Sequence, residues 1–396
     1  MDAVKPEVSL GAQKTLSPFP HQEPELIDIS FLNKLLAYCV DEGVEDLVLM
    51  TGEPWSIIWS AQIVKMGKRG ISQAELEPLL QQMTSNVNAA IDLQRAQDLD
   101  FNYSLRLERG RTIRFRANAT SCLGPHGRSG THIVIRPNGK DIPSLEDLNV
   151  DQYIREHCQP KTGIVLITGP TGSGKSTLLD AILRDLLTSD SPKHLLTFFS
   201  PIETDLQAIP GRTGIAAQCE IGQKGYGANL TSYSEAVRNF LRRHPHVVVF
   251  GEARDKETIN GAVYASMTGH GTYTTTHTAN VHMALSRMAD IFGGSDRVRV
   301  MNGLIDNTRL IVHQRLVKTP TGIGRTPIIS ALAIDSGMRS ELLRTEHSLV
   351  PSVIMRLTKE QGIDLWTDAQ KKHAAGLIHD DEMVSLKAEL ISEGAI

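Results

Sequence analysis

A run of eight residues in the middle of the chain has the composition and spacing of a phosphate-binding loop. Gly169-Pro-Thr-Gly-Ser-Gly-Lys-Ser176 fits the pattern G-x-x-x-x-G-K-[ST]. Its glycines let several N–H groups point at one anion, and the helix expected near Lys175 adds the positive end of its dipole. Lys175 should reach the β- and γ-phosphates of ATP, and the Ser176 hydroxyl should bind Mg²⁺. The residues predicted to hold the nucleotide are Gly169, Pro170, Thr171, Gly172, Ser173, Gly174, Lys175, Ser176 and Thr177.

Two carboxylates follow apolar runs that are typical of buried parallel strands. Glu252 comes after Val247-Val-Val-Phe250 and one glycine, so we expect it to serve Mg²⁺ beside the loop. Glu203 follows the run from Leu195 to Phe199, where a carboxylate can orient the attacking water. The alternatives are an ordinary surface glutamate for Glu252 and a plain turn for Glu203.

Two histidines, His270 and His277, flank a run of small, β-prone residues, Gly271-Thr-Tyr-Thr-Thr-Thr276. This composition predicts a strand that ends at His277. A histidine there can hydrogen-bond the γ-phosphate or sense its loss, and we expect both histidines to serve the nucleotide. A core histidine bonded to a backbone carbonyl is the alternative, while zinc binding lacks partner ligands.

Three arginines lie on expected strands of the N-terminal part. Residues 112–119 alternate strictly between polar and apolar side chains, which puts Arg114 and Arg116 on the polar face. Arg136 belongs to the next expected strand. Surface arginines are usually solvated, but these three are also candidates for arginine fingers that reach ATP bound in a neighbouring subunit.

The elements that must position these residues fall into two groups. Apolar runs at 163–168, 195–199 and 247–250, with a helical pattern at 178–187, indicate a doubly wound α/β domain. Before them, helical and strand patterns indicate a small α+β domain. The expected strands there are 46–50, 57–64 and 112–119, and the expected helices are 32–40 and 72–83, the second capped by Ser72 with Glu75.

The chain of 396 residues is long enough for two domains. We predict a disordered lead-in at 1–26, the α+β domain at 27–138, a linker at 139–150, the ATPase domain at 151–335 and a helical C-terminal region at 336–396. The net charge of −4 argues against a nucleic-acid binder. Because no apolar run suits a bilayer span or a signal peptide, we expect a cytoplasmic protein that reaches a membrane through partners.

Four motifs in one order resemble the secretion ATPases of the PilT/GspE type, which drive type IV pili and type II and type IV secretion. After the phosphate loop come the segments that stand at the family's Asp box, atypical Walker B and His box. These are Phe199-Ser-Pro-Ile-Glu203, Gly251-Glu252, and Thr268-Gly-His270 through Thr276-His-Thr278.

The resemblance implies a PAS-like N-terminal domain and a RecA-like C-terminal domain in a hexameric ring, with ATP between domains and subunits. It implies that Glu203 polarises water, that Glu252 serves Mg²⁺ indirectly and that His277 contacts phosphate. It places Arg114, Arg116 and Arg136 where such enzymes carry arginines that act in trans. Inner-membrane components of an export apparatus are the implied partners.

The chain departs from the family pattern in two places. Phe199-Ser200 replaces an acidic pair, and His244-Pro-His246 stands where Asp-Pro-Asp is usual. The chain also lacks the tetracysteine zinc module of assembly ATPases and the Ala-Ile-Arg-Ala-Gly signature of retraction ATPases. It is therefore most similar to the DotB-like branch of type IVB (Dot/Icm) secretion and to related conjugative-plasmid ATPases. A pilus retraction or assembly ATPase is the alternative within the family.

Other classes of protein share a phosphate loop. A P-loop kinase would cleave ATP only when its acceptor is present, and a non-hydrolysing adaptor would keep its nucleotide intact. A DNA-translocating motor shares the RecA-like fold, but the acidic charge balance weighs against it.

Overall fold

The computed structural model describes residues 16–60, 62–95, 97–106, 112–137, 142–222, 228–321 and 324–392. These residues form two compact units. The first unit holds the described residues up to 137, together with 201–205 and the described part of 222–229. The second unit holds the other described residues from 142 onward.

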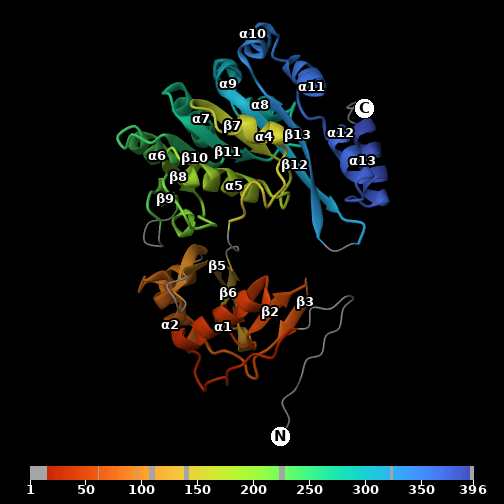
Figure 1. The fold of residues 1–396 in the computed structure, drawn as a ribbon. Helices are drawn as coiled ribbons and strands as arrows, with labels where there is room; N and C mark the ends of the chain where they lie inside the picture. The colour runs from red at the N-terminus through yellow and green to blue at the C-terminus, as the bar shows by residue number, and fades with distance from the viewer. Residues whose placement is uncertain are drawn as a thin grey trace. The chain divides into compact units, whose positions relative to one another are not determined.

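The first unit is built on one antiparallel sheet with helices α1 to α3 packed against it (Figure 1). The sheet has six strands in the order β3-β2-β1-β6-β5-β4. The strands are β1 (Asp46–Met50), β2 (Ser56–Trp59), β3 (Gln62–Lys65), β4 (Leu99–Arg106), β5 (Thr112–Leu123) and β6 (Ser129–Pro137), and the helices are α1 (Ile29–Glu42), α2 (Gln73–Thr84) and α3 (Ala89–Gln94).

Local chemistry explains where these elements begin and end. The predicted cap of α2 is confirmed, because the Glu75 carboxylate accepts hydrogen bonds from the Ser72 backbone N–H at 2.9 Å and from its hydroxyl at 2.7 Å. The single strand predicted at 57–64 is wrong. Ser60 adopts a left-handed conformation with φ of 51°, which turns the chain and divides this stretch into the hairpin strands β2 and β3.

The predicted lead-in is packed where the structure describes it. Residues 1–15 lie outside the described ranges, but from Leu16 onward the chain touches the first unit's core. The ring of Phe19 makes edge contacts with Phe31, Tyr38 and Trp55, whose centroids lie 5.3–5.7 Å away. The chain therefore packs against this core from Leu16, well before the first residue of α1.

The second unit contains a seven-stranded sheet in the order β13-β12-β7-β11-β10-β8-β9. All neighbouring strands are parallel except the pair β12 and β13. The predicted strands at 163–168, 195–199 and 247–250 are present, whereas β9, β12 and β13 were not predicted. The strands are β7 (Gly163–Thr168), β8 (His194–Phe199), β9 (Ile215–Glu220), β10 (Val247–Glu252), β11 (Gly271–Thr276), β12 (Thr308–Lys318) and β13 (Arg325–Ala333).

Helices cover both faces of this sheet, which confirms the predicted doubly wound α/β fold. In β7, Val165 and Ile167 pack with α5 (Lys175–Thr188), while Ile164 and Leu166 pack with α7 (Lys256–Met267) and α9 (Gly294–Asn307). A strand buried on both sides needs a continuous apolar run, and all six residues of β7 are buried. The other helices are α4 (Gln152–His157), α6 (Tyr233–Phe240) and α8 (Ala284–Ala289).

The C-terminal region is helical, as its amphipathic pattern predicts. It comprises α10 (Ser336–Arg344), α11 (Val350–Gln361), α12 (Leu365–Ala374) and α13 (Asp380–Ser392). Leu386 and Leu390 of α13 share a small core with Val317 of β12 and Ile328 of β13. Helices α12 and α13 lie side by side against this end of the sheet (Figure 1).

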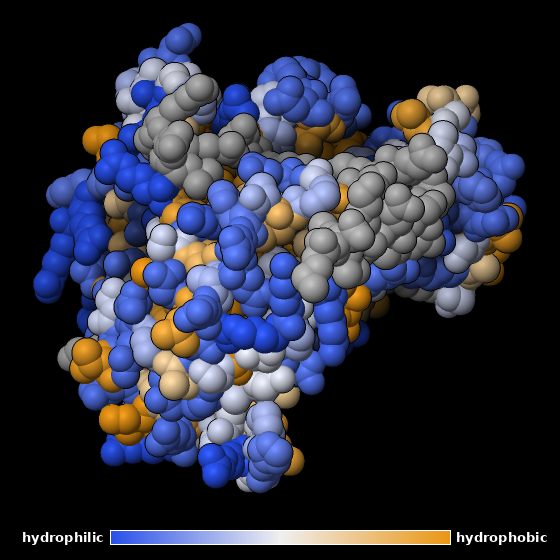
Figure 2. All heavy atoms as spheres, turned by 90° about the horizontal axis from the view of Figure 1, so that it is seen from below, coloured by the Kyte–Doolittle hydropathy of each residue, from blue (hydrophilic) through white to orange (hydrophobic). Residues whose placement is uncertain are grey.

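None of the described helices combines the length and the apolar character that a membrane crossing needs. The face drawn in Figure 2 is mainly hydrophilic, and its hydrophobic residues occur singly or in small groups.

Candidate active site

The phosphate loop joins β7 to α5 at the carboxyl edge of the second unit's sheet, where open α/β sheets bind ligands. Its close approach to β12 explains two of its glycines. A Cβ atom at Gly169 would lie 2.3 Å from the backbone oxygen of Gln314, and one at Gly174 would lie 2.7 Å from the Gln314 side-chain nitrogen. Both glycines also have positive φ angles, of 148° and 82°, so other residues would be strained there.

Lys175 is the first residue of α5, and it is buried inside the loop. Its Nζ donates hydrogen bonds to the backbone oxygens of Gly169 at 2.8 Å and Pro170 at 2.9 Å. Burial lowers the pKa of Lys175, and the nearby Glu252 carboxylate opposes this shift. The ammonium group is thus held by weak oxygen acceptors, in a position where phosphate oxygens are better partners.

His277, which follows β11, contacts both Lys175 and Glu252, the last residue of β10. His277 Nδ1 lies 3.5 Å from Lys175 Nζ, and His277 Nε2 lies 3.2 Å from Glu252 Oε1. Because a lysine ammonium can only donate, Nδ1 is the acceptor and Nε2 carries the hydrogen that faces Glu252. His277 therefore bridges Lys175 and Glu252 by its two ring nitrogens. The three residues follow or end the strands β7, β11 and β10, which lie in this order in the sheet.

A β-bulge aims Glu252 into this group. The pairing of β10 with β11 shifts between Phe250 and Glu252, so that Gly251 is the extra residue. A Cβ atom at Gly251 would lie 2.5 Å from the Phe199 ring, which explains why the bulge carries glycine. Thr275 Oγ1 donates to the Gly251 oxygen at 2.8 Å and fixes the bulge. The bulge thus explains how Glu252 reaches His277 although Gly251 separates it from the apolar run that ends at Phe250.

The oxygen groups near Lys175 fit a magnesium–phosphate ligand. Ser176 is exposed at the start of α5, and Glu252 is half-buried, so a hydroxyl and a carboxylate are accessible at one edge. The hydroxyl of Ser173 is buried and has no hydrogen-bond partner among the residues that the structure describes. An unsatisfied buried hydroxyl inside the loop is consistent with a polar ligand at this place.

The structure does not bring His270 to the phosphate loop. His270 precedes the first residue of β11 and His277 follows the last, so they lie at opposite edges of the sheet, roughly 20 Å apart for a six-residue strand. His270 Nδ1 lies 3.1 Å from the Ala265 oxygen, and its ring packs edge-on against Phe240. His270 therefore matches the alternative interpretation, a histidine bonded to a backbone carbonyl.

The unusual His246 also lies at the amino edge of the sheet. Its Nδ1 accepts a hydrogen bond from the His194 backbone N–H at 3.0 Å, which joins the start of β8 to the residue before β10. His244, two residues earlier, has a left-handed conformation with φ of 46°. This departure from the family pattern thus has a local structural role, far from Lys175.

Glu203 follows the carboxyl end of β8, as its position in the sequence predicts, and its side chain is exposed. It belongs to segment 201–205, which is part of the first unit.

The three arginines share one face of the first unit's sheet, but they differ in their partners. Arg136 forms two hydrogen bonds to the Asp46 carboxylate, of 2.8 and 2.7 Å, and this pairing raises the pKa of Arg136. Arg116 lies opposite Arg136 in the β5–β6 register. Within the described ranges neither Arg114 nor Arg116 has a hydrogen-bonded or ion-paired partner.

Sequence reasoning missed the contribution of β12 to the loop. The Gln314 side-chain nitrogen donates to the Ser173 backbone oxygen at 2.6 Å, and His313 contacts Thr168 just before the loop. The available signal was His313-Gln-Arg315 inside an otherwise apolar, β-branched run. Such polar residues in a buried strand need partners, and the partner lies in the loop for Gln314 and just before it for His313.

Comparison with known proteins assigns the family. Residues 73–364 match the family model described as "Type II/IV secretion system protein". The type IV pilus ATPase PilU of Pseudomonas aeruginosa is 29% identical over 366 residues, which cover 89% of this chain and 90% of PilU.

Two solved structures share the whole architecture. The ATPase DotB of Legionella pneumophila superposes with a TM-score of 0.77 and 34% identity over 94% of this chain and 98% of DotB. The pilus retraction motor PilT with bound ADP gives a TM-score of 0.74 and 25% identity over 89% of this chain and 96% of PilT. The resemblance to PilT/GspE-type and DotB-like ATPases is confirmed, and the chain belongs to the type II/IV secretion system protein family.

Proposed function

We propose that this chain is an ATP hydrolase that powers a type IVB-like secretion or conjugation apparatus. It works as a cytoplasmic homohexamer that inner-membrane components of the apparatus recruit to the membrane. The observation that carries the proposal is the contact of Lys175 with both its own loop and the His277–Glu252 pair. This arrangement links a phosphate-binding cation to a carboxylate through one hydrogen-bonded histidine.

In the proposed reaction, Lys175 exchanges the Gly169 and Pro170 oxygens for phosphate oxygens of ATP. Ser176 and Glu252 would hold Mg²⁺, and the ion would neutralise charge on the phosphates. His277 moves with Lys175 because the two are in contact, and it thereby responds to the γ-phosphate. Glu203 orients the attacking water.

In the proposed hexamer, the arginines of one subunit supply further positive charge to the ATP of the next subunit. Arg114 and Arg116 have no partner within the described part of their own chain, and they lie on one polar sheet face. In a cyclic assembly each subunit can present this face to the ATP of its neighbour. Arg136 supports that face through its pair with Asp46.

The cellular system is the finer part of the proposal. Similarity to Legionella DotB, at 34% identity over almost the whole chain, favours a type IVB-like apparatus. Similarity to PilU and PilT favours the alternative, a motor for type IV pilus retraction. The bound ADP in the PilT structure supports an adenine nucleotide as the ligand in either case.

The enzymatic part is tested with purified protein, Mg-ATP and no added acceptor. We expect the wild-type chain to release phosphate, and Glu252→Gln to bind ATP but to release phosphate about 100-fold more slowly. Release that requires an added acceptor would indicate a kinase, and ATP that stays intact for hours would indicate an adaptor. Near-native turnover by Glu252→Gln would contradict the assigned role of this carboxylate.

The cellular part is tested by deleting the gene in its host and restoring either the wild type or Glu252→Gln. We expect only the wild type to restore transfer of effectors or of a conjugative plasmid. Restored twitching motility without an effect on transfer would favour the pilus alternative.

A further inference from the structure

Strand β12 forms a wall of the phosphate loop and also receives the C-terminal helices. It runs parallel to β7, with His313 opposite Thr168, the residue just before the loop. Beyond this point Gln314 contacts the loop, and Arg315 comes next. A residue on this part of β12 can therefore couple the position of the C-terminal helices to the conformation of the loop.

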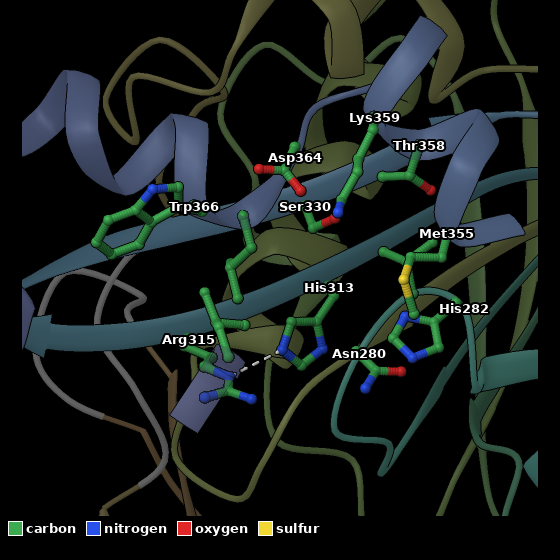
Figure 3. Close-up of a pocket in the computed structure, with 13 residues that line it drawn as sticks. Asn280, His282, His313, Arg315, Ser330, Met355, Thr358, Lys359, Asp364 and Trp366 are labelled. Atoms are coloured by element: carbon green, nitrogen blue, oxygen red, sulfur yellow. Dashed lines mark hydrogen bonds between the residues drawn. The ribbon is translucent and has the colours of Figure 1, made fainter. Parts of the chain in front are cut away.

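His313 connects Thr168 to Arg315. His313 is fully buried, with Nδ1 3.0 Å from Thr168 Oγ1 and Nε2 3.2 Å from Arg315 Nε. An arginine Nε–H can only donate, so Nε2 of His313 accepts and Nδ1 carries the hydrogen that faces Thr168. The imidazole is therefore a neutral bridge with a defined tautomer, and Figure 3 shows its bond to Arg315.

Arg315 joins three parts of the site. Beyond His313, one terminal nitrogen donates to Glu389 Oε2 on α13 at 2.7 Å, and the other donates to the Ala279 oxygen at 3.0 Å. Ala279 lies two residues after His277, which contacts Lys175. The guanidinium thus connects the loop, the His277 segment and the C-terminal helix.

Hydrogen bonds, more than packing, fix the position of Arg315. Cavities of about 40 and 220 Å³ lie beside it. The smaller one is also lined by His282, His313 and Lys359 (Figure 3), and the larger one by loop residues and by Glu389. A side chain with space nearby keeps its orientation only while its polar partners are present, and Glu389 is the one anion bonded to it among the described residues.

We propose that Arg315 is a positioning residue for the phosphate loop and that Glu389 holds it in place. Helix α13 thereby sets how tightly the loop binds the nucleotide. This inference rests on the proposed function, because it requires ATP at the loop. Removing the Glu389 charge frees a guanidinium that is only 15% exposed, and the bonds to His313 and Ala279 then loosen.

The test compares Glu389→Gln with Glu382→Gln, a matched change on the same helix whose carboxylate lies 3.8 Å from Lys318. We expect Glu389→Gln to raise the Kd and KM for Mg-ATP roughly five- to tenfold, with kcat changed less than twofold. Glu382→Gln should leave all three unchanged. Arg315→Lys should weaken binding to an intermediate extent, because one ammonium cannot make all three contacts.

A double variant separates positioning from a general loss of stability. If Glu389 acts through Arg315, then Arg315→Ala with Glu389→Gln should bind ATP no more weakly than Arg315→Ala alone. Losses that multiply, or wild-type binding by Glu389→Gln, would overturn the inference while leaving the proposed function intact. A wild-type chain that binds no nucleotide would overturn both.

Discussion

Two charged regions of the molecule differ in how completely their charges are satisfied. At the carboxyl edge of the second unit's sheet, His277 contacts both Lys175 and Glu252. On the polar face of the first unit's sheet, Arg136 is paired with Asp46, but Arg114 and Arg116 have no partner in the described ranges. The region around Lys175 has its counter-charge within the same chain, whereas the arginine face has two cations without an anionic partner among the described residues.

The difference agrees with the roles that the proposed function gives to the two regions. Groups that must hold a nucleotide before reaction need fixed positions, and their mutual contacts provide them. Groups that would complete a site only when subunits assemble can stay unpaired in the single chain, because a solvated arginine without a partner hardly changes the free energy of folding. The comparison therefore predicts different effects for substitutions in the two regions.

The largest effect is expected at Lys175. Lys175→Ala removes the cation that the loop holds in place, so both nucleotide binding and turnover should be lost, the latter by more than about 10³-fold. Calorimetry with Mg-ATP and a phosphate-release assay measure the two losses. Lys161→Ala, an exposed lysine just before β7, is the matched control and should behave as wild type. If Lys175→Ala still bound Mg-ATP, the region around Lys175 would not be the one that holds the nucleotide, and the comparison with the arginine face would fail.

A more selective loss is expected for the arginine face. Arg114→Ala with Arg116→Ala should keep nucleotide binding but lower turnover by roughly 10³-fold, as for arginines that act only on the developing charge. Mixing this variant with Lys175→Ala should restore part of the activity, because some interfaces then combine an intact loop with intact arginines. Absence of recovery in verified mixed oligomers would argue against action between subunits.

Within the arginine face, Arg136 should affect stability. Asp46 is only 7% exposed, so Arg136→Ala leaves a buried carboxylate without its two hydrogen bonds. We expect the free energy of unfolding to fall by about 1–3 kcal/mol, measured by urea denaturation. Arg116→Ala, directly opposite on β5, should change it by less than about 0.5 kcal/mol. Equal effects of the two changes would show that the paired and unpaired arginines are equivalent.

The same comparison separates what the sequence could predict from what it could not. The loop, the strands β7, β8, β10 and β11 and the cap at Ser72 follow from local patterns, because each depends on residues close in sequence. The small, β-prone residues between His270 and His277 predicted the strand correctly, yet that strand places the two histidines at opposite edges of the sheet.

Contacts between residues far apart in the chain could not be predicted from the sequence. His313 is satisfied by Thr168, which is 145 residues away, and no local pattern connects the two. The hairpin at Ser60 was missed because a left-handed serine interrupts a run whose many β-prone residues otherwise resemble a single strand. The partners of the arginines were equally hidden, since Asp46 precedes Arg136 by 90 residues.

The smallest expected effect is the pH dependence that His313 of the second unit introduces. Burial lowers the pKa of His313 to about 3, and the positive charges of Arg315 and Lys175 add to this shift. The unfolded chain takes up a proton near pH 6.5 and the native chain does not, so stability falls as the pH falls. Between pH 7 and pH 6 the loss is about 0.7 kcal/mol.

A buried carboxylate of the first unit should not contribute over this range. Glu75 is held charged by Arg69, the Ile27 backbone and Ser72, and the pKa of Glu75 is lowered to about 2. The stability that Glu75 adds is therefore lost only below its unfolded pKa, near pH 4.5, as the pH falls further. Calorimetric unfolding at pH 7 and pH 6 tests both expectations, with His313→Gln as the variant that cannot titrate. An unchanged pH slope in His313→Gln would mean that another group carries the effect, and that the bridge between Thr168 and Arg315 is not held neutral by burial.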